Sequence, residues 1–147
     1  MKQKQKKSFG VIPVFKNPEG DFLFCIVLAS AGHWGFPKGH QDLPESEEET
    51  ALRELEEETG IKNANLVKDK SFTERYVFKR DGFTYNKFVK YFLGFITSIS
   101  DATPDNFKEE IPELRWVNYK EAKNLLSFKE RIEILDEAFK YLNAREK

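Results

Sequence analysis

The sequence predicts a single domain with the architecture of an α/β sandwich. Three observations support this prediction. The expected elements follow in the order strands, helix, strands, helices; the 147 residues suffice for one domain with a real core; and no repeat or low-complexity linker marks a second domain. We expect residues 8–147 to form this domain and residues 1–7, rich in lysine, to be a flexible basic tail.

Two strands are expected before the first helix. Residues 8–16 form an apolar stretch in which Pro13 predicts an edge strand or a bulge, because proline donates no ladder hydrogen bond. Turn residues at 17–20 lead into a second strand at 21–30, so the two should pair as a hairpin or lie side by side in the sheet. Residues 31–40 contain three glycines and a proline, which predicts an irregular, tightly turned loop.

A helix is predicted within residues 39–61. Ser46 can cap its first turn, Glu49 completes a capping box three residues later, and Gly60 ends it. Pro44 suits a chain that is about to enter a helix. The apolar residues Ala51, Leu52 and Leu55 should form the face that packs on the sheet.

The same helix presents three carboxylates from consecutive turns. Glu54, Glu57 and Glu58 are spaced at i, i+3 and i+4, and like charges at this spacing repel by about 0.2–0.5 kcal/mol per pair. A divalent cation would relieve that repulsion, and a set of oxygen ligands favours Mg²⁺ or Mn²⁺ over zinc. The neighbouring run at 47–49, by contrast, is expected to be a solvated face.

The second half of the chain predicts two long strands, a short strand and two helices. Strands at 64–80 and 87–99 flank a turn at 80–82, and the second of them is apolar enough to be central in the sheet. After them we expect a loop at 98–106, a strand at 114–117 and helices at 119–126 and 128–143.

Composition narrows the class of protein. No apolar run approaches the ~20 residues of a membrane span, and the basic start has no secretory hydrophobic region, so we expect no membrane partner. Cys25 is the only cysteine, which excludes an internal disulfide, fits a reducing, cytoplasmic location and predicts a core position. The net charge of −1 gives no general attraction to nucleic acid, and we favour a monomer.

The acidic helix belongs to a longer pattern. Gly39, five residues, Glu45, seven residues and the run RELEEETGI at 53–61 resemble the Nudix box without a gap. The resemblance implies a mixed sheet between helices, an α/β/α sandwich, and metal-dependent hydrolysis of a nucleoside diphosphate linked to another group. It also implies these roles: Glu54, Glu57, Glu58 and the Gly39 carbonyl as metal ligands, Glu54 or Glu58 as general base, Arg53 paired with Glu45 to hold the carboxylates, and Glu110 as a further acidic ligand or base.

The flanks of the box resemble one subgroup, the asymmetrically cleaving diadenosine tetraphosphate hydrolases. The matching segments are HWGFPKGH at 33–40 and LSFKE at 126–130. This resemblance implies that Lys38 contacts phosphate, that His40 assists near the attacked phosphorus and that aromatic residues stack on adenine. Tyr76, Phe128 and Trp34 are the stacking candidates, and Lys79, Lys87, Lys90 and Tyr91 are further candidates for the polyphosphate.

We therefore expect a Mg²⁺-dependent enzyme that cleaves a small dinucleoside polyphosphate, diadenosine tetraphosphate, to ATP and AMP. Removal of pyrophosphate from RNA ends is an alternative, for which the lysines at 2–7 are the only hint in the sequence. A nucleotide-binding regulator without catalysis is another, although such a protein should have lost box carboxylates and this chain has lost none. An acidic helix that binds a basic partner would not need the glycine-rich loop.

Overall fold

The computed structural model describes residues 2–99 and 110–146. Within them the elements follow in the expected order of strands, a helix, strands and helices. Their bounds are β1 Lys2–Lys16, β2 Phe22–Leu28, β3 Trp34–Gly35, β4 Lys38–His40, α1 Glu47–Thr59, β5 Ala64–Arg80, β6 Phe83–Ile96, β7 Glu113–Asn118, α2 Tyr119–Leu125 and α3 Lys129–Arg145.

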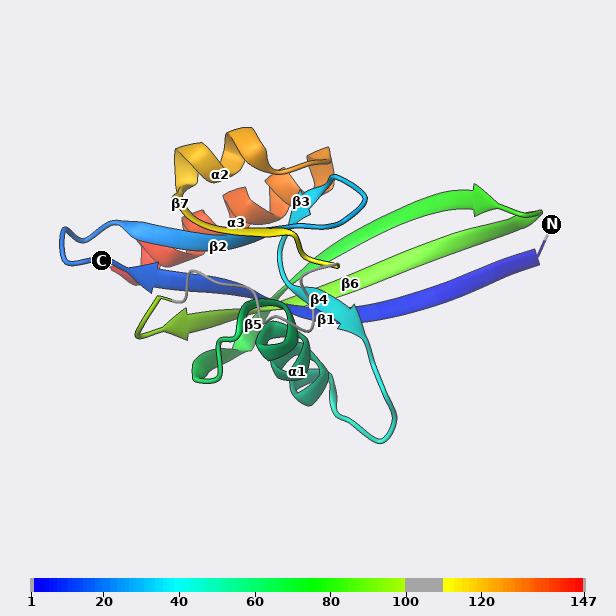
Figure 1. The fold of residues 1–147 in the computed structure, drawn as a ribbon, viewed down its shortest axis with the longest axis horizontal. Helices are drawn as coiled ribbons and strands as arrows, with labels where there is room; N and C mark the ends of the chain where they lie inside the picture. The colour runs from blue at the N-terminus through cyan, green and yellow to red at the C-terminus, as the bar shows by residue number, and fades with distance from the viewer. Residues whose placement is uncertain (1, 100–109, 147) are drawn as a thin grey trace.

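The strands form one mixed sheet between helices, as the sequence predicts. Its order is β3-β2-β1-β6-β5, with β4 paired to β1 and β7 paired to β2. The β1–β6 pair is parallel and the other pairs are antiparallel. Figure 1 shows α1 below the sheet and α2 and α3 above it, with β1, β5 and β6 extending together past the helices.

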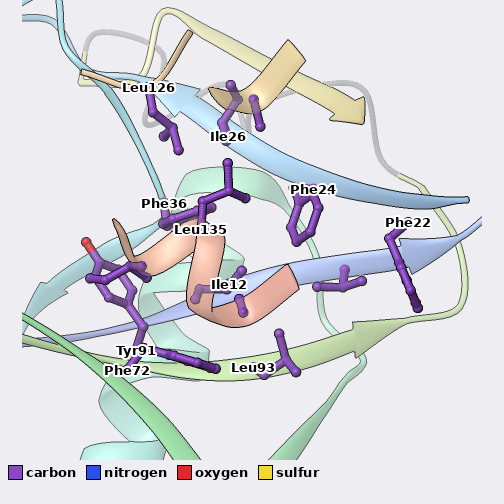
Figure 2. Close-up of a cluster of buried hydrophobic side chains, with 14 of the residues drawn as sticks. Ile12, Phe22, Phe24, Ile26, Phe36, Phe72, Tyr91, Leu93, Leu126 and Leu135 are labelled. Carbon is purple, nitrogen blue, oxygen red and sulfur yellow. The ribbon is translucent and has the colours of Figure 1, made fainter. Parts of the chain in front are cut away.

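Alternating side chains of the central strands build a core on each face of the sheet. On β6, Tyr91 and Leu93 pack toward α3, whereas Phe92 and Ile96 pack toward α1. Figure 2 shows the larger core, in which Leu135 of α3 lies over side chains of β1, β2 and β6. Burial of both faces explains why β1 and β6 are apolar where the helices cover them.

Strand β1 differs from the prediction at both its start and its place in the sheet. It begins at Lys2, where residues 2–7 pair in parallel with β6 instead of forming a tail. It is also central, not an edge. Pro13 is tolerated because the neighbour of β1 on that side changes from β4, at residues 8–10, to β2, at residues 14–16.

Local signals in the sequence are largely confirmed in the structure. The Arg80–Gly82 turn joins β5 to β6, and β6 is central as predicted. The loop expected at 31–40 does contain turns, but β3 and β4 lie within it. Cys25 is fully buried, and burial raises the pKa of its thiol. Most of the loop expected at 98–106 lies outside the described residues.

Helix α1 begins and ends where its sequence predicts. Ser46 and Glu49 form a complete capping box, and Gly60 adopts a left-handed conformation at the C-terminal end. Ala51 and Leu55 are fully buried, but Leu52 is exposed, because it lies about 100° around the helix from Ala51. The packed face is therefore narrower than predicted. Among the helices that the structure describes, none is both long and apolar enough to cross a bilayer.

Candidate active site

Arg53 ties the loop before α1 to the carboxylates on the helix. Its Nε and Nη2 donate to the two oxygens of Glu45 at 2.6 and 3.1 Å, the bidentate geometry expected of a strong pair. Nη1 donates to Glu54 at 3.0 Å and to Glu57 at 3.2 Å, and Nη2 also donates to the His40 carbonyl at 3.0 Å. The hydrogen bonds from Arg53 lower the pKa of Glu45 to about 2, so this carboxylate stays ionised.

Gly39 lies directly beneath the Glu54 carboxylate. A Cβ at position 39 would be 2.1 Å from Glu54 Cδ and 2.3 Å from its Oε1, closer than any side chain tolerates. Only glycine leaves room for the carboxylate at this point of β4. The Gly39 backbone and the Glu54 oxygens are thereby brought together.

Glu58 is the most buried carboxylate of the helix. Its Oε2 accepts a hydrogen bond from the Lys38 backbone N–H at 3.1 Å. Burial, and then the charge of neighbouring Glu54, raise the pKa of Glu58 well above its ordinary value. Burial also raises the pKa of Glu54, although Arg53 opposes that rise. Arg53 and Lys38 therefore offset the cost of burying these two adjacent carboxylates only in part.

The donor set fits a hard divalent cation. Within residues 2–99 and 110–146, no three acidic, histidine or cysteine side chains already converge in a metal-binding arrangement. The available donors are nevertheless carboxylate oxygens and the Gly39 carbonyl, which Mg²⁺ prefers. Burial raises the pKa of Glu54 and of Glu58, and a bound cation would lower both values again.

Glu54 and Glu58, but not Glu57, line a cleft of about 930 Å³ on the α3 side of the sheet. The cleft brings together acids from three segments, Asp42, Glu54 with Glu58, and Glu110, and it also contains cations and aromatic rings. Its lining includes Glu54, Glu58, Glu110, Gly39, His40, Lys38, Lys87, Tyr76, Phe78, Arg80, Phe128, Arg131 and His33. A smaller hollow of about 530 Å³ near Glu47, Arg75 and Phe88 contains none of the box carboxylates.

Lys38 and Lys87 both line the cleft, and their charges act on one another. Burial and the charge of Lys38 lower the pKa of Lys87. Lys90, which we predicted as a phosphate contact, does not line the cleft: it points to the α1 face and its Nζ lies 2.8 Å from Glu47. Lys87 and Lys90 differ by an odd number of residues, so the pleat of β6 puts them on opposite faces.

Two of the four aromatic candidates line the cleft and two do not. Tyr76 and Phe128 line the cleft from β5 and from the start of α3. Tyr91 is fully buried, with its ring 5.7 Å from that of Phe36, so its predicted contact with phosphate is wrong for this structure. Trp34 is absent from the cleft lining; its ring packs on the core and under the Arg115 guanidinium, 5.1 Å away.

His40 and Glu110 both line the cleft, although they are far apart in the sequence. His40 Nδ1 is 3.4 Å from Ser8 Oγ, and the His40 carbonyl is held by Arg53. Glu110 is exposed, and its carbonyl accepts from the Ser30 N–H at 2.9 Å, which fixes the segment leading to β7 beside the end of β2.

Several lining residues were missed from the sequence. Phe78 and Arg80 follow Tyr76 at every second position of β5, so strand alternation could have found them. His33 was not among the candidates from the sequence, yet it lines the cleft with its ring 4.7 Å from that of Phe128. Arg131 lies in the first turn of α3, and no pattern in the sequence indicates that it lines the cleft.

Comparison with known proteins agrees with this geometry. A family model described as the NUDIX domain matches residues 4–138. The asymmetrical bis(5'-nucleosyl)-tetraphosphatase of Mus musculus is 33% identical over 135 residues, covering 90% of this chain and 87% of that protein. An RNA pyrophosphohydrolase of Bartonella bacilliformis is 29% identical over 148 residues, covering 86% of each. The solved structure of a C. elegans Ap4A hydrolase binary complex has a TM-score of 0.80 at 25% identity, covering 95% of this chain and 98% of that one.

Proposed function

The chain belongs to the NUDIX family, as a hydrolase of nucleoside polyphosphates, and we propose that it cleaves diadenosine tetraphosphate asymmetrically to ATP and AMP. The observation that carries the proposal is the composition of one cleft, which Glu54 and Glu58 line together with Lys38, Lys87 and the aromatic rings of Tyr76 and Phe128. Acids suit a metal ion, cations suit a polyphosphate and rings suit a nucleobase.

Glu54 and Glu58, with Glu57 and the Gly39 carbonyl, are the groups that would hold Mg²⁺ or Mn²⁺. Such an ion neutralises phosphate oxygens and lowers the pKa of bound water. Arg53 keeps the loop carbonyl of His40 and the helix carboxylates in fixed positions, as outer partners of metal ligands do.

The remaining residues of the cleft bind and orient the substrate. Lys38 and Lys87 supply positive charge to the polyphosphate, which in turn would relieve the repulsion that lowers the pKa of Lys87. Tyr76 and Phe128 offer rings for stacking on adenine. His40 lies at the cleft beside the Gly39 backbone, where it can donate to a phosphate oxygen.

A raised carboxylate pKa also suits the proton transfer that hydrolysis requires. A general base works best when its pKa approaches the working pH. Burial raises the pKa of both Glu54 and Glu58, and a bound cation would lower the pKa of whichever carboxylate it contacts. Glu110 and Asp42 are the other acids that line the cleft. We assign the acceptance of the proton from the attacking water to one of Glu54, Glu58 and Glu110.

RNA 5' ends are a second candidate substrate, favoured by the length of the cleft. Its lining continues beyond Tyr76 to Phe78 and Arg80, along the part of β5 that extends past the helices. Rings and cations in a row suit a single-stranded nucleic acid, on which successive bases stack. The similarity to the Bartonella enzyme supports the same alternative.

Product analysis separates the two substrates. The protein is incubated with Mg²⁺ and either diadenosine tetraphosphate or a 5'-triphosphorylated RNA, and the nucleotides are separated. ATP and AMP in equal amounts, with the RNA intact, would support the proposal. Pyrophosphate or phosphate from the RNA, with the dinucleotide intact, would overturn the choice of substrate and keep the family chemistry.

A further inference from the structure

Arg131, in the first turn of α3, connects three segments that surround the cleft. Its Nη1 donates to the Trp34 carbonyl of β3 at 3.0 Å. Its Nε lies 3.4 Å from Glu74 Oε2 of β5, and its Cζ lies 4.9 Å from the centroid of the Phe128 ring. The side chain is only 10% exposed and that of Glu74 only 1%, so the guanidinium is enclosed on most sides.

The Arg131 guanidinium lies against Gly35, where the missing Cβ leaves room for it. A Cβ at position 35 would be 2.9 Å from Arg131 Nη1 and 3.1 Å from Cζ. Gly35 does not have the positive φ that would itself require glycine. We therefore attribute the glycine to the close approach of the guanidinium. Gly35 and Arg131 act as a matched pair although 96 positions separate them.

Stability alone does not account for the Glu74–Arg131 pair. Buried charges lose hydration, and the loss is recovered only when the pair is well hydrogen-bonded. Here, within the described residues, Arg131 Nε and both Glu74 oxygens have no hydrogen-bond partner. An apolar pair of the same size would often be as stable. The pair is better explained by what it holds in place.

The group held in place is Phe128, whose backbone is strained. Its φ is +72°, a conformation that non-glycine residues adopt rarely and only when their surroundings enforce it. Neighbouring Ser127 is bonded to β3 twice: Trp34 N donates to Ser127 Oγ at 3.0 Å, and Ser127 N donates to the Trp34 carbonyl at 3.2 Å. The Phe128 ring is 51% exposed and contacts both Arg131 and His33.

We propose that Arg131 is a positioning residue for the nucleoside end of the substrate: Glu74 and Gly35 fix its guanidinium, and the guanidinium fixes the Phe128 ring at the cleft. The inference rests on the proposed function in one respect, that Phe128 stacks on a base. Arg131 then sets substrate affinity and leaves the chemical step to the box carboxylates.

Three variants disturb this arrangement in different ways. Arg131→Lys keeps a positive charge beside Glu74 but loses the planar group that contacts Trp34 and Phe128. Glu74→Gln with Arg131→Met removes both buried charges at similar volume, which preserves folding. Gly35→Ala pushes the guanidinium away without touching Arg131. The matched control is Lys129→Met with Glu133→Gln, an exposed pair 3.9 Å apart on the same helix.

Kinetics on diadenosine tetraphosphate test the assignment. Each of the three variants should raise KM by about 5- to 10-fold and leave kcat within about twofold, whereas the control pair changes neither. Phe128→Ala should raise KM similarly, and adding Arg131→Lys to it should have no further effect, because the two act through one ring. An unchanged KM, a fall in kcat alone, or effects that multiply in the double variant would each overturn the proposal.

An NMR measurement, which does not depend on turnover, tests the positioning of Phe128 independently of the proposed function. Proton NMR should show a nuclear Overhauser effect between the His33 and Phe128 rings, whose centroids are 4.7 Å apart. Arg131→Lys should abolish it, and the control pair should retain it. If the contact survives in Arg131→Lys, the positioning role is wrong whatever the substrate. If it is lost and the wild-type protein does not cleave the dinucleotide, the positioning role stands and only the proposed substrate fails.

Discussion

The carboxylate of Glu54 rests against the bare backbone of Gly39, so that a Cβ at position 39 would be 2.1 Å from Glu54 Cδ. This contact joins the end of β4 to α1 at the place where the proposed metal ligands meet. The glycine is therefore required by its neighbour, not by its own backbone conformation.

Gly39→Ala should displace the Glu54 carboxylate and lower activity by about 100-fold or more, since a small misplacement of a reacting group can cost that much. The protein should still fold, because Glu54 is a movable side chain. Gly20→Ala is the control: a Cβ there meets nothing within 4 Å, but φ is +90°. It should cost about 1 kcal/mol of unfolding free energy and no activity. Equal activity of the two variants would contradict the account.

Glu58 should make the metal-free protein less stable as the pH rises. Its pKa in the folded state is raised well above the ordinary value of 4.5, so between these two values the folded chain binds more protons than the unfolded chain. The free energy of unfolding must then fall with rising pH. Thermal unfolding from pH 4.5 to 8 with a chelator measures this slope. Glu58→Gln should make the slope shallower, and an identical slope would argue against the burial of this charge.

Lys87 and Lys90 should behave differently although both lie on β6. Lys87→Met should raise KM for the polyphosphate by about 10-fold, because Lys87 lines the cleft and charge-assisted contacts are the strong ones. Lys90→Met should leave KM unchanged, because Lys90 pairs with Glu47 on the opposite face. Steady-state kinetics with the two variants decides the matter. A larger effect for Lys90 would mean that the phosphate binds on the α1 side.

Arg53→Lys should weaken metal binding. Lysine cannot reproduce the bidentate contact with Glu45 while also reaching Glu54 and the His40 carbonyl. Loss of such an outer partner typically lowers metal affinity or activity by roughly 10- to 100-fold. The Mg²⁺ concentration at half-maximal rate should rise accordingly, and activity should recover in part at high Mg²⁺. A reduced rate with an unchanged Mg²⁺ requirement would instead indicate a role in substrate binding.

The sequence predicted features whose causes are local. The capping box of α1, its end at Gly60 and the Glu45–Arg53 pair all depend on residues close in the chain, and the structure contains each of them. The α/β sandwich followed from the order of the elements. Local chemistry therefore placed the acidic helix and the loop before it correctly.

The errors came from relationships that no local pattern encodes. Alternation places Lys87 and Lys90 on opposite faces of β6, but it does not say which face carries the cleft or that Tyr91 is buried, because core residues pack on both faces. The start of β1 is polar and forms a strand only because β6 pairs with it. Arg131 and Glu74 are 57 positions apart, and only the packing of α3 on β5 brings them together.

The most direct test of the account is a Mg²⁺ titration of ATP and AMP formation from diadenosine tetraphosphate by the wild-type protein, Glu58→Gln and Glu56→Gln. Glu56 is an exposed acid on the same helix and serves as the matched control. We predict that the wild-type protein forms no products without Mg²⁺ and forms ATP and AMP once Mg²⁺ is added. At saturating Mg²⁺, Glu58→Gln should lose activity by roughly 100-fold or more, whereas Glu56→Gln should keep full activity. A Glu58→Gln protein as active as the wild type would contradict the assignment of this cleft as a metal-dependent active site.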